Sequence, residues 1–364
     1  MSLSRPAADS DDVPPVHVPA VHVHQLPPAR VLVGPGAVRH VAGEVERLGA
    51  GRVLLVATPS AAAAAARVAA DLAPRPVARF DRPAPHTPVA VTAEALAVAA
   101  DAGADCVVAI GGGSAIGLGK AVAARTGTPQ VAVPTTYAGS EATPVLGETE
   151  DGVKRTRRDP ALAPGTIVYD PGLTLTMPRG LTLTSAMNAL AHAVEALWAP
   201  DRGMVTDALA TEAAAGILGA LPEVLDEPSA PGPRARLQSA AWLAGICLAQ
   251  TRMGLHHQLA HVLGGAFGLP HAELHAMLLA HVMAFNLPAA PGAASRLARV
   301  TGRDDPVEAV AGLARAHEGA TRLSELGVPR DGLPDVAARV AAEPYPNPRP
   351  VTAAEVADLL GGAW

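Results

Sequence analysis

The chain is poor in aromatic residues and in clustered positive charge. Aromatic residues make up 2% of its 364 residues, and the formal net charge is −6. No long run of Lys and Arg is interleaved with aromatic side chains, the pattern that follows phosphates along a nucleic acid. We therefore predict that the protein does not bind nucleic acid.

Cysteine and long apolar runs are also scarce. The two cysteines, Cys106 and Cys247, lie in apolar segments far apart in sequence, which indicates buried thiols in a reducing compartment and excludes a disulfide framework. Charge, Gly or Pro interrupts every stretch long enough to span a membrane, and the N-terminus lacks the basic-then-apolar order of a signal peptide. These features predict a cytoplasmic protein without a membrane partner.

Hydrophobic residues, in contrast, make up 49% of the chain, which is enough for a core in each of two domains. Residues 1–28 are rich in proline and predict a flexible tail. From Arg30 onward, strands alternate with helices, and the continuous apolar runs at 52–57 and 105–110 are typical of buried parallel strands. The pattern predicts a Rossmann-like α/β domain over 29–178, with a doubly wound, mostly parallel sheet, and an all-α domain over 179–364.

A glycine-rich loop follows the strand at 105–110. Gly111-Gly-Gly-Ser114 leads directly into a helix, and glycines at such a junction let backbone N–H groups approach a pyrophosphate at the positive end of the helix dipole. The motif alone is also compatible with a tight turn, but its position after a buried strand favours a dinucleotide. We predict that Gly112, Gly113 and Ser114 bind the cofactor. A second, hydroxyl-rich loop at 135–141 should lie beside it.

Histidines are concentrated in the second half of the chain. His256, His257, His261 and His271 lie on a predicted helix and the turn that closes it, and His257 and His261 share one helix face. Asn188, His192 and Glu195 recur at helical spacing on an earlier segment. An imidazole can act as a metal ligand, a general acid or a cation, and several buried without partners would be costly in a plain core. The two helices therefore predict a polar pocket.

Several motifs together resemble the iron-containing (group III) alcohol dehydrogenase superfamily and, within it, the maleylacetate reductases. The resemblance rests on residues 111–114, 134–141, 147–154, 185–198, 254–257, 269–273 and 347–352. It implies the dehydroquinate synthase-like architecture of a nucleotide-binding domain and a helical catalytic domain, with the active cleft between them. It also implies a homodimer.

The resemblance assigns metal positions but implies that no metal is required. In metal-dependent relatives an Asp and three His bind the ion, and these positions match Asn188, His192, His257 and His271 here. An amide oxygen is a weaker ligand than a carboxylate. Maleylacetate reductases resemble this chain in having Asn at the first position, so a metal-independent reaction is expected.

The activity implied is reduction of maleylacetate, a 4-oxo-2-enedioate, to 3-oxoadipate during aromatic catabolism. Hydride adds to the conjugated alkene, and negative charge develops on the ketone oxygen. His256 or His257 would stabilise this charge, with His192, His261 and Tyr137 as further catalytic candidates. Tyr137 has a second interpretation, which is stacking on the nicotinamide.

Cofactor and substrate contacts follow by position. Thr58-Pro-Ser60 stands at the end of the second strand, where proteins that exclude a 2′-phosphate usually have Asp or Glu, so NADH and NADPH are both expected cofactors. The positions that resemble nicotinamide-side contacts are Thr135, Thr136, Ser140, Thr143 and Lys154. Lys154 also belongs to a basic cluster at 154–158, which alternatively is simply solvated. This cluster, Arg252, Asn188 and His271 are expected to bind a dicarboxylate substrate.

Two other functions stay open at this point. A paralogue that reduces a different enone or ketone in a biosynthetic pathway is favoured by Gln258, where the resemblance leads us to expect a basic residue, and by the N-terminal extension. The other is a lyase or cyclase that recycles bound NAD, or a nucleotide-binding protein without turnover. Net consumption of NAD(P)H with maleylacetate would separate the three.

Overall fold

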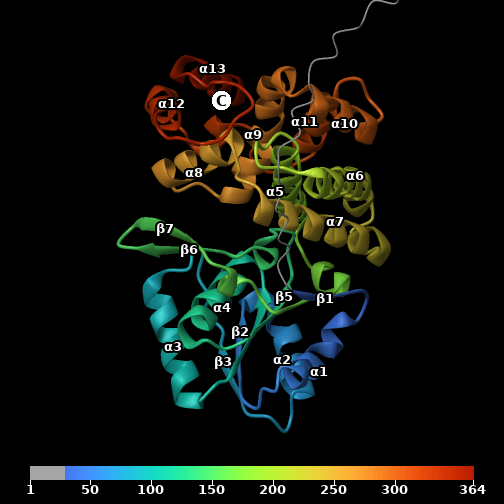
Figure 1. The fold of residues 1–364 in the computed structure, drawn as a ribbon, viewed down its shortest axis with the longest axis vertical. Helices are drawn as coiled ribbons and strands as arrows, with labels where there is room; N and C mark the ends of the chain where they lie inside the picture. Colours follow the sequence, from blue (N-terminus) through green and yellow to red (C-terminus); the bar gives the residue numbers. More distant parts are fainter. Residues whose placement is uncertain (1–28) are drawn as a thin grey trace, which may run out of the picture.

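The computed structural model describes residues 29–364, and the predicted tail at 1–28 lies outside them. An α/β region and a helical region lie one above the other, and a β-hairpin lies near their boundary (Figure 1). The predicted fold class is confirmed.

The α/β region is built on a six-stranded sheet in which every neighbouring pair is parallel. The strands lie in the order β1 (Arg30–Val33), β8 (Thr166–Tyr169), β5 (Gln130–Pro134), β4 (Cys106–Gly111), β2 (Val53–Ala57) and β3 (Val77–Phe80). All six strands therefore present their carboxyl ends to one edge, which faces the helical region.

Both faces of the sheet are covered, because alternate residues of a strand point to opposite sides. Val53 and Leu55 of β2 belong to the core formed with α1 (Val41–Arg47) and α2 (Ala62–Asp71). Leu54 and Val56 belong to the core on the other face, formed with α3 (Val89–Ala102) and α4 (Gly113–Thr126). This double coverage explains the continuous apolar runs. Both cysteines are buried and unpaired, as predicted.

Two features of this region were not predicted: strand β8 and the antiparallel hairpin of β6 (Val145–Glu150) and β7 (Val153–Arg158). The hairpin turns at Asp151 and Gly152, which have φ values of 49° and 76°. An Asp-Gly pair suits a two-residue hairpin turn because both residues tolerate positive φ. The Asp-Gly dipeptide could have indicated the hairpin from the sequence. Strand β7, however, consists largely of charged residues, which are not typical of a strand.

The helical region is the predicted all-α domain. Its helices are α5 (Arg179–Ala196), α6 (Met204–Asp226), α7 (Pro231–Gln250), α8 (Leu255–Phe267), α9 (His271–Asn286), α10 (Pro291–Thr301), α11 (Pro306–Arg315), α12 (Leu333–Ala342) and α13 (Ala353–Ala363). Helix α5 is buried along almost its whole length and packs against α6, α7 and α9. It therefore brings polar side chains into the interior.

Short 3-10 helices connect these elements: η1 (Ala37–His40), η2 (Pro59–Ala61), η3 (Ser140–Ala142), η4 (Pro160–Leu162), η5 (Pro171–Thr174), η6 (Leu287–Ala289), η7 (Leu323–Leu326) and η8 (Arg330–Gly332). Among the described residues, α6 alone is long and apolar enough to span a membrane by length and composition. It contains Asp207, Glu212 and Pro222, and one side of it is buried against α5 and α7. A core helix passes the same test.

Candidate active site

A cavity of about 630 Å³ lies at the carboxyl edge of the sheet. Residues that follow five different strands line it: Gly36 after β1, Thr58 after β2, Gly112 after β4, Thr135 after β5 and Asp170 after β8. Open α/β sheets bind their ligands at this edge. The predicted cofactor residues Ser114 and Thr136 also line the cavity.

The glycine-rich loop after β4 lines part of this cavity. A Cβ atom at Gly111, where φ is 149°, would lie 2.8 Å from Thr58 Oγ1, so the chain requires glycine there. Helix α4 begins at Gly113, with Gly112 as its N-cap, and the first N–H groups of a helix have no partner within it. A Cβ atom at Gly113 would meet no atom within 4 Å. The free space and the helix N-terminus fit a dinucleotide pyrophosphate.

This geometry predicts the effect of Gly113→Val. The side chain would fill only open space in the free protein, so we expect normal folding. It would, however, occupy the place of the pyrophosphate, and nicotinamide cofactor binding should weaken by about 100-fold or more, roughly 2.7 kcal/mol. Cofactor titration would measure the loss, with Gly219→Val on the exposed side of α6 as the control. Unchanged cofactor affinity would show that the pyrophosphate lies elsewhere.

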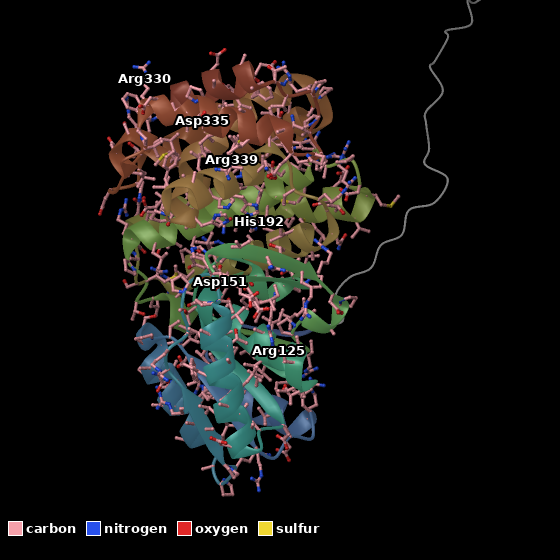
Figure 2. The ribbon with its side chains drawn as sticks, turned by 90° about the vertical axis from the view of Figure 1, so that its left-hand side faces the viewer. Arg125, Asp151, His192, Arg330, Asp335 and Arg339 are labelled. Atoms are coloured by element: carbon pink, nitrogen blue, oxygen red, sulfur yellow. The ribbon has the colours of Figure 1, made fainter. Side chains whose placement is uncertain are left out.

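Six histidines converge in the helical region. His192 comes from α5, and the others come from α8 and α9: His256, His257, His261, His271 and His275. Neighbouring rings have centroids 4.3–6.4 Å apart. Figure 2 shows His192 near the boundary with the α/β region. His275 was not predicted, although its position four residues after His271 was a usable signal.

Glu195 is a buried acidic residue that forms hydrogen bonds with the segment carrying His256 and His257. Its carboxylate accepts hydrogen bonds from the backbone N–H of Gly254 (3.1 Å) and of His256 (2.9 Å), and it lies 2.6 Å from His257 Nδ1. Burial raises the pKa of Glu195. A Cβ atom at Gly254 would come within 2.6 Å of the Pro346 carbonyl oxygen and 3.1 Å of Glu195 Oε1, so glycine is needed for this approach.

Burial and the contact with Glu195 together determine the protonation and the tautomer of His257. Burial, with a smaller contribution from His261, lowers the pKa of His257 to about 3, so its ring is neutral at neutral pH. The single proton lies on Nδ1, which donates to the Glu195 carboxylate. His257 Nε2 therefore carries a lone pair in the resting protein.

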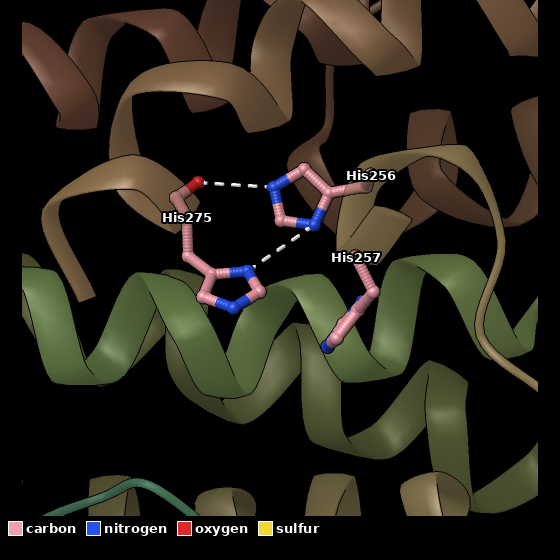
Figure 3. A group of neighbouring side chains, drawn as sticks. All are labelled: His256, His257 and His275. Carbon is pink, nitrogen blue, oxygen red and sulfur yellow. Dashed lines mark hydrogen bonds between the residues drawn. The ribbon is translucent and has the colours of Figure 1, made fainter. Parts of the chain in front are cut away.

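A directed chain of hydrogen bonds joins His256, His275 and His271, and Figure 3 shows the contacts between His256 and His275. His256 Nε2 lies 3.1 Å from the carbonyl oxygen of His275 and must donate to it, since a carbonyl only accepts. His256 Nδ1 then accepts from His275 Nδ1 at 3.3 Å, and His275 Nε2 accepts from His271 Nε2 at 2.9 Å. Burial lowers the pKa of His256 to about 4 and that of His275 well below its usual value, which keeps both rings neutral.

This chain does not favour the predicted catalytic role of His256. Both of its ring nitrogens have partners within the protein, and its side chain is fully buried. In this arrangement no ring nitrogen of His256 is available to a substrate. Its role is to orient His275, a role that sequence spacing could not reveal because the partner comes from α9.

Three buried polar atoms in the cluster have no hydrogen-bond partner among the described residues: Asn188 Oδ1, His192 Nδ1 and His257 Nε2. The rings of His192 and His257 are stacked, with centroids 5.0 Å apart. Burying such atoms without partners is costly, which indicates that a ligand supplies the missing contacts. Tyr345 Oη is a fourth unpartnered atom, and burial and the charge of Glu195 raise the pKa of Tyr345 to about 12.

The loop after β5 links the cavity to the histidines. Thr135 and Thr136 line the cavity, and further along the loop a Cβ atom at Gly139 would lie 3.2 Å from Gly245 Cα and 3.7 Å from His192 Nδ1. The buried Lys120 amine holds the end of this loop by donating to the backbone carbonyls of Ser140, Thr143 (2.8 Å) and Val145 (3.0 Å). The same loop therefore lies against both the cavity and the histidine cluster.

Tyr137 does not lie in this site. It is 1% exposed, its hydroxyl donates to Thr174 Oγ1, and Arg234 donates to it. The described contacts of this buried ring support neither a catalytic role for Tyr137 nor stacking on a nicotinamide. Thr143 is also buried, and its hydroxyl accepts from Lys120 at 3.1 Å, so it supports the loop without lining the cavity.

The predicted basic residues have other partners. Arg252 is exposed and pairs with Asp201 at 3.3 Å. Arg158 donates to the carbonyls of Ala249 and Leu248, which ties the hairpin to α7. Lys154 pairs through its backbone with Thr149 in the hairpin, and its side chain lies outside the described part of the structure.

The four positions that match a metal site offer weaker donors than a carboxylate and three free imidazoles would. Asn188 replaces the carboxylate, and His271 Nε2 is hydrogen-bonded to His275. Ring nitrogens of His256, His257 and His275 lie within 4.8 Å of one another, but those of His256 and His275 are engaged in the chain described above. The nearby Glu195 carboxylate already accepts three hydrogen bonds. The donor set is therefore incomplete.

Comparison with known proteins agrees with this architecture. Residues 28–171 match the family "Iron-containing alcohol dehydrogenase", and residues 182–364 match "Fe-containing alcohol dehydrogenase family, C-terminal". The chain belongs to the iron-containing alcohol dehydrogenase family. It is therefore a nicotinamide-dependent oxidoreductase, and the resemblance seen in the sequence motifs is confirmed.

Individual relatives match over nearly their full length. Maleylacetate reductase 1 of Rhodococcus opacus is 47% identical, over 93% of this chain and 94% of that protein. Maleylacetate reductase of Sphingobium indicum is 43% identical, over 92% and 95%. The crystal structure of maleylacetate reductase from a Rhizobium species superimposes with a TM-score of 0.90 at 43% identity and covers 95% of this chain and 98% of its own.

Proposed function

We propose that the protein reduces maleylacetate to 3-oxoadipate with NADH or NADPH, in aromatic catabolism. The observation that carries this is the set of unpartnered polar atoms on Asn188, His192 and His257, next to the loop that lines the cofactor cavity. Relatives named maleylacetate reductases, 40–47% identical over more than 90% of the chain, support the substrate. We also propose a cytoplasmic homodimer with neither nucleic acid nor membrane as a partner.

When bound, the reduced nicotinamide supplies a hydride to the alkene carbon β to the ketone. The protein must then stabilise the negative charge on the ketone oxygen and donate one proton to the enolate. A neutral His192 ring with its proton on Nδ1 donates to that oxygen, and the Asn188 side chain binds beside it. His261 is exposed and His271 half-buried, and we place both at the entrance of the substrate site.

His257 is the proton donor in this proposal. Its resting Nε2 has no proton, but a dicarboxylate brings two negative charges into a cluster of neutral imidazoles and raises their pKa values. A proton taken up at Nε2 produces an imidazolium that the Glu195 carboxylate stabilises at 2.6 Å. That proton then moves to the enolate. Substrate binding and proton uptake are therefore coupled, which suits an anionic substrate.

The direct test is incubation with maleylacetate and either cofactor. Nicotinamide absorbance at saturating enzyme would follow the oxidation, and the product would be identified as 3-oxoadipate by mass spectrometry. One equivalent of NAD(P)H should disappear per maleylacetate. No oxidation with maleylacetate, together with turnover of a different enone or ketone, would establish the paralogous reductase instead.

The structure offers that alternative little support. Gln258 donates to Glu343 at 2.7 Å, a contact outside the histidine cluster. A change at this position leaves the unpartnered atoms of the cluster untouched. Family membership also disfavours the non-reductive functions.

We further propose that catalysis requires no metal, because the donor set is incomplete. Treatment with EDTA should leave kcat/KM within about twofold, and no stoichiometric iron or zinc should copurify. Asn188→Asp should raise the affinity for Fe²⁺ or Zn²⁺, measured by metal titration, because it restores an anionic oxygen ligand. Activity that EDTA removes and Fe²⁺ or Zn²⁺ restores would refute metal independence.

A further inference from the structure

Arg67 lines the cofactor cavity from helix α2. The helix follows β2, and its cavity side carries Ala63, Ala64 and Arg67, with Ser60 just before the helix begins. Arg67 is exposed, and within the described residues its guanidinium has no ion pair or hydrogen bond. A cation without a protein partner therefore faces the space where the sheet binds its cofactor.

The surroundings of Arg67 suit an anion. Thr58 and Ser60 line the same part of the cavity, and their hydroxyl oxygens lie 3.1 Å apart. Among the described residues that line the cavity, Asp170 is the single acid, and it stands after β8, at a different strand. Its carboxylate accepts hydrogen bonds from the backbone of Val38 (3.2 Å) and Gly172 (2.9 Å). The end of β2 thus presents one cation and two hydroxyls.

In dinucleotide-binding sheets, the adenosine ribose lies beyond the end of the second strand. An acid there accepts hydrogen bonds from the ribose 2′-hydroxyl, whereas an arginine pairs with a 2′-phosphate. We propose that Arg67, together with the hydroxyls of Thr58 and Ser60, binds the 2′-phosphate of NADPH. This inference rests on the proposed use of a nicotinamide cofactor and assigns the residue that distinguishes NADPH from NADH.

The experiment measures the dissociation constants of NADPH and NADH for the intact enzyme in the absence of substrate. Arg67→Ala should weaken NADPH binding by about tenfold or more and change NADH binding by less than about threefold, because only NADPH loses a charge-assisted contact. Arg67→Lys should retain part of the NADPH affinity. The control is Arg299→Ala, which removes an exposed charge of the same sign from α10 and should change neither constant.

A second variant keeps the inference testable if Arg67→Ala perturbs the fold. Thr58→Asp places a carboxylate at the end of β2 and should weaken NADPH relative to NADH by about tenfold or more. Equal changes for both cofactors in both variants, or no change in either, would overturn the assignment of Arg67. Because no substrate is present, failure to reduce maleylacetate would refute the proposed function and leave this result unaffected.

Discussion

Replacing His257 by alanine is expected to lower kcat/KM for maleylacetate by about 100-fold or more, the range for loss of a positioned proton donor. The expectation rests on the unpartnered His257 Nε2 atom and on the Glu195 carboxylate that fixes the opposite side of the ring. Because the proton is needed mainly in the transition state, kcat should fall together with kcat/KM. Steady-state rates with saturating cofactor would measure both.

The matched control is His281→Ala, which removes a partly buried imidazole of α9 that lines a separate cavity. Its kcat should stay within about threefold of the wild-type value. A His257→Ala variant that changes KM alone would show that His257 binds a substrate carboxylate. Near-normal kcat would move the proton donor to His192 or to Tyr345, whose hydroxyl also has no hydrogen-bond partner among the described residues.

Sequence patterns predicted the sheet better than the hairpin. The runs at 52–57 and 105–110 lie within a residue of β2 and β4, since strands buried on both faces are continuously apolar. Strand β7 consists largely of charged residues and does not cover a hydrophobic core. Its sequence therefore lacks the apolar pattern that would predict a strand. The two-domain boundary stays a prediction, although α5 begins at Arg179.

The candidate site shows a different limit of sequence analysis. Helical spacing indicated that histidines of two segments lie close together, and the structure brings their rings into one cluster, but the role of each ring depends on partners from other helices. His256 and His257 are adjacent in sequence, yet one is committed to His275 and the other to Glu195. Tyr137 lies in a loop that lines the cavity, but its own side chain packs into the core. Orientation follows from tertiary contacts that no spacing encodes.

The buried imidazoles are also expected to make the fold sensitive to acid. Burial lowers the pKa of His257 to about 3 and of His256 to about 4, and it lowers the pKa values of His192 and His275 as well. Unfolded histidines titrate near pH 6.5. Between these values the unfolded chain binds more protons than the folded protein, so stability rises with pH and is lost as pH falls below about 6.5.

Glu195 acts in the opposite direction. Its pKa is raised in the folded protein, so its contribution to stability is present at low pH and is lost as pH rises. One carboxylate offsets one imidazole at most, and the net effect of four histidines keeps the sign given above. Each proton taken up on unfolding changes the free energy of unfolding by up to about 1.4 kcal/mol per pH unit.

Thermal or urea unfolding between pH 8 and pH 5 would measure this dependence on the intact protein. We expect stability to fall steeply below pH 6.5, and we expect His275→Gln to reduce the slope by about one proton, because it removes one buried imidazole while keeping hydrogen-bonding groups. His40→Gln, at an exposed position of η1, should leave the slope unchanged. A stability that does not vary over this range would mean that the imidazoles take up protons at the same pH in the folded protein as in the unfolded chain. The His257 ring would then already carry its proton below about pH 6.5, and proton uptake would not accompany substrate binding there.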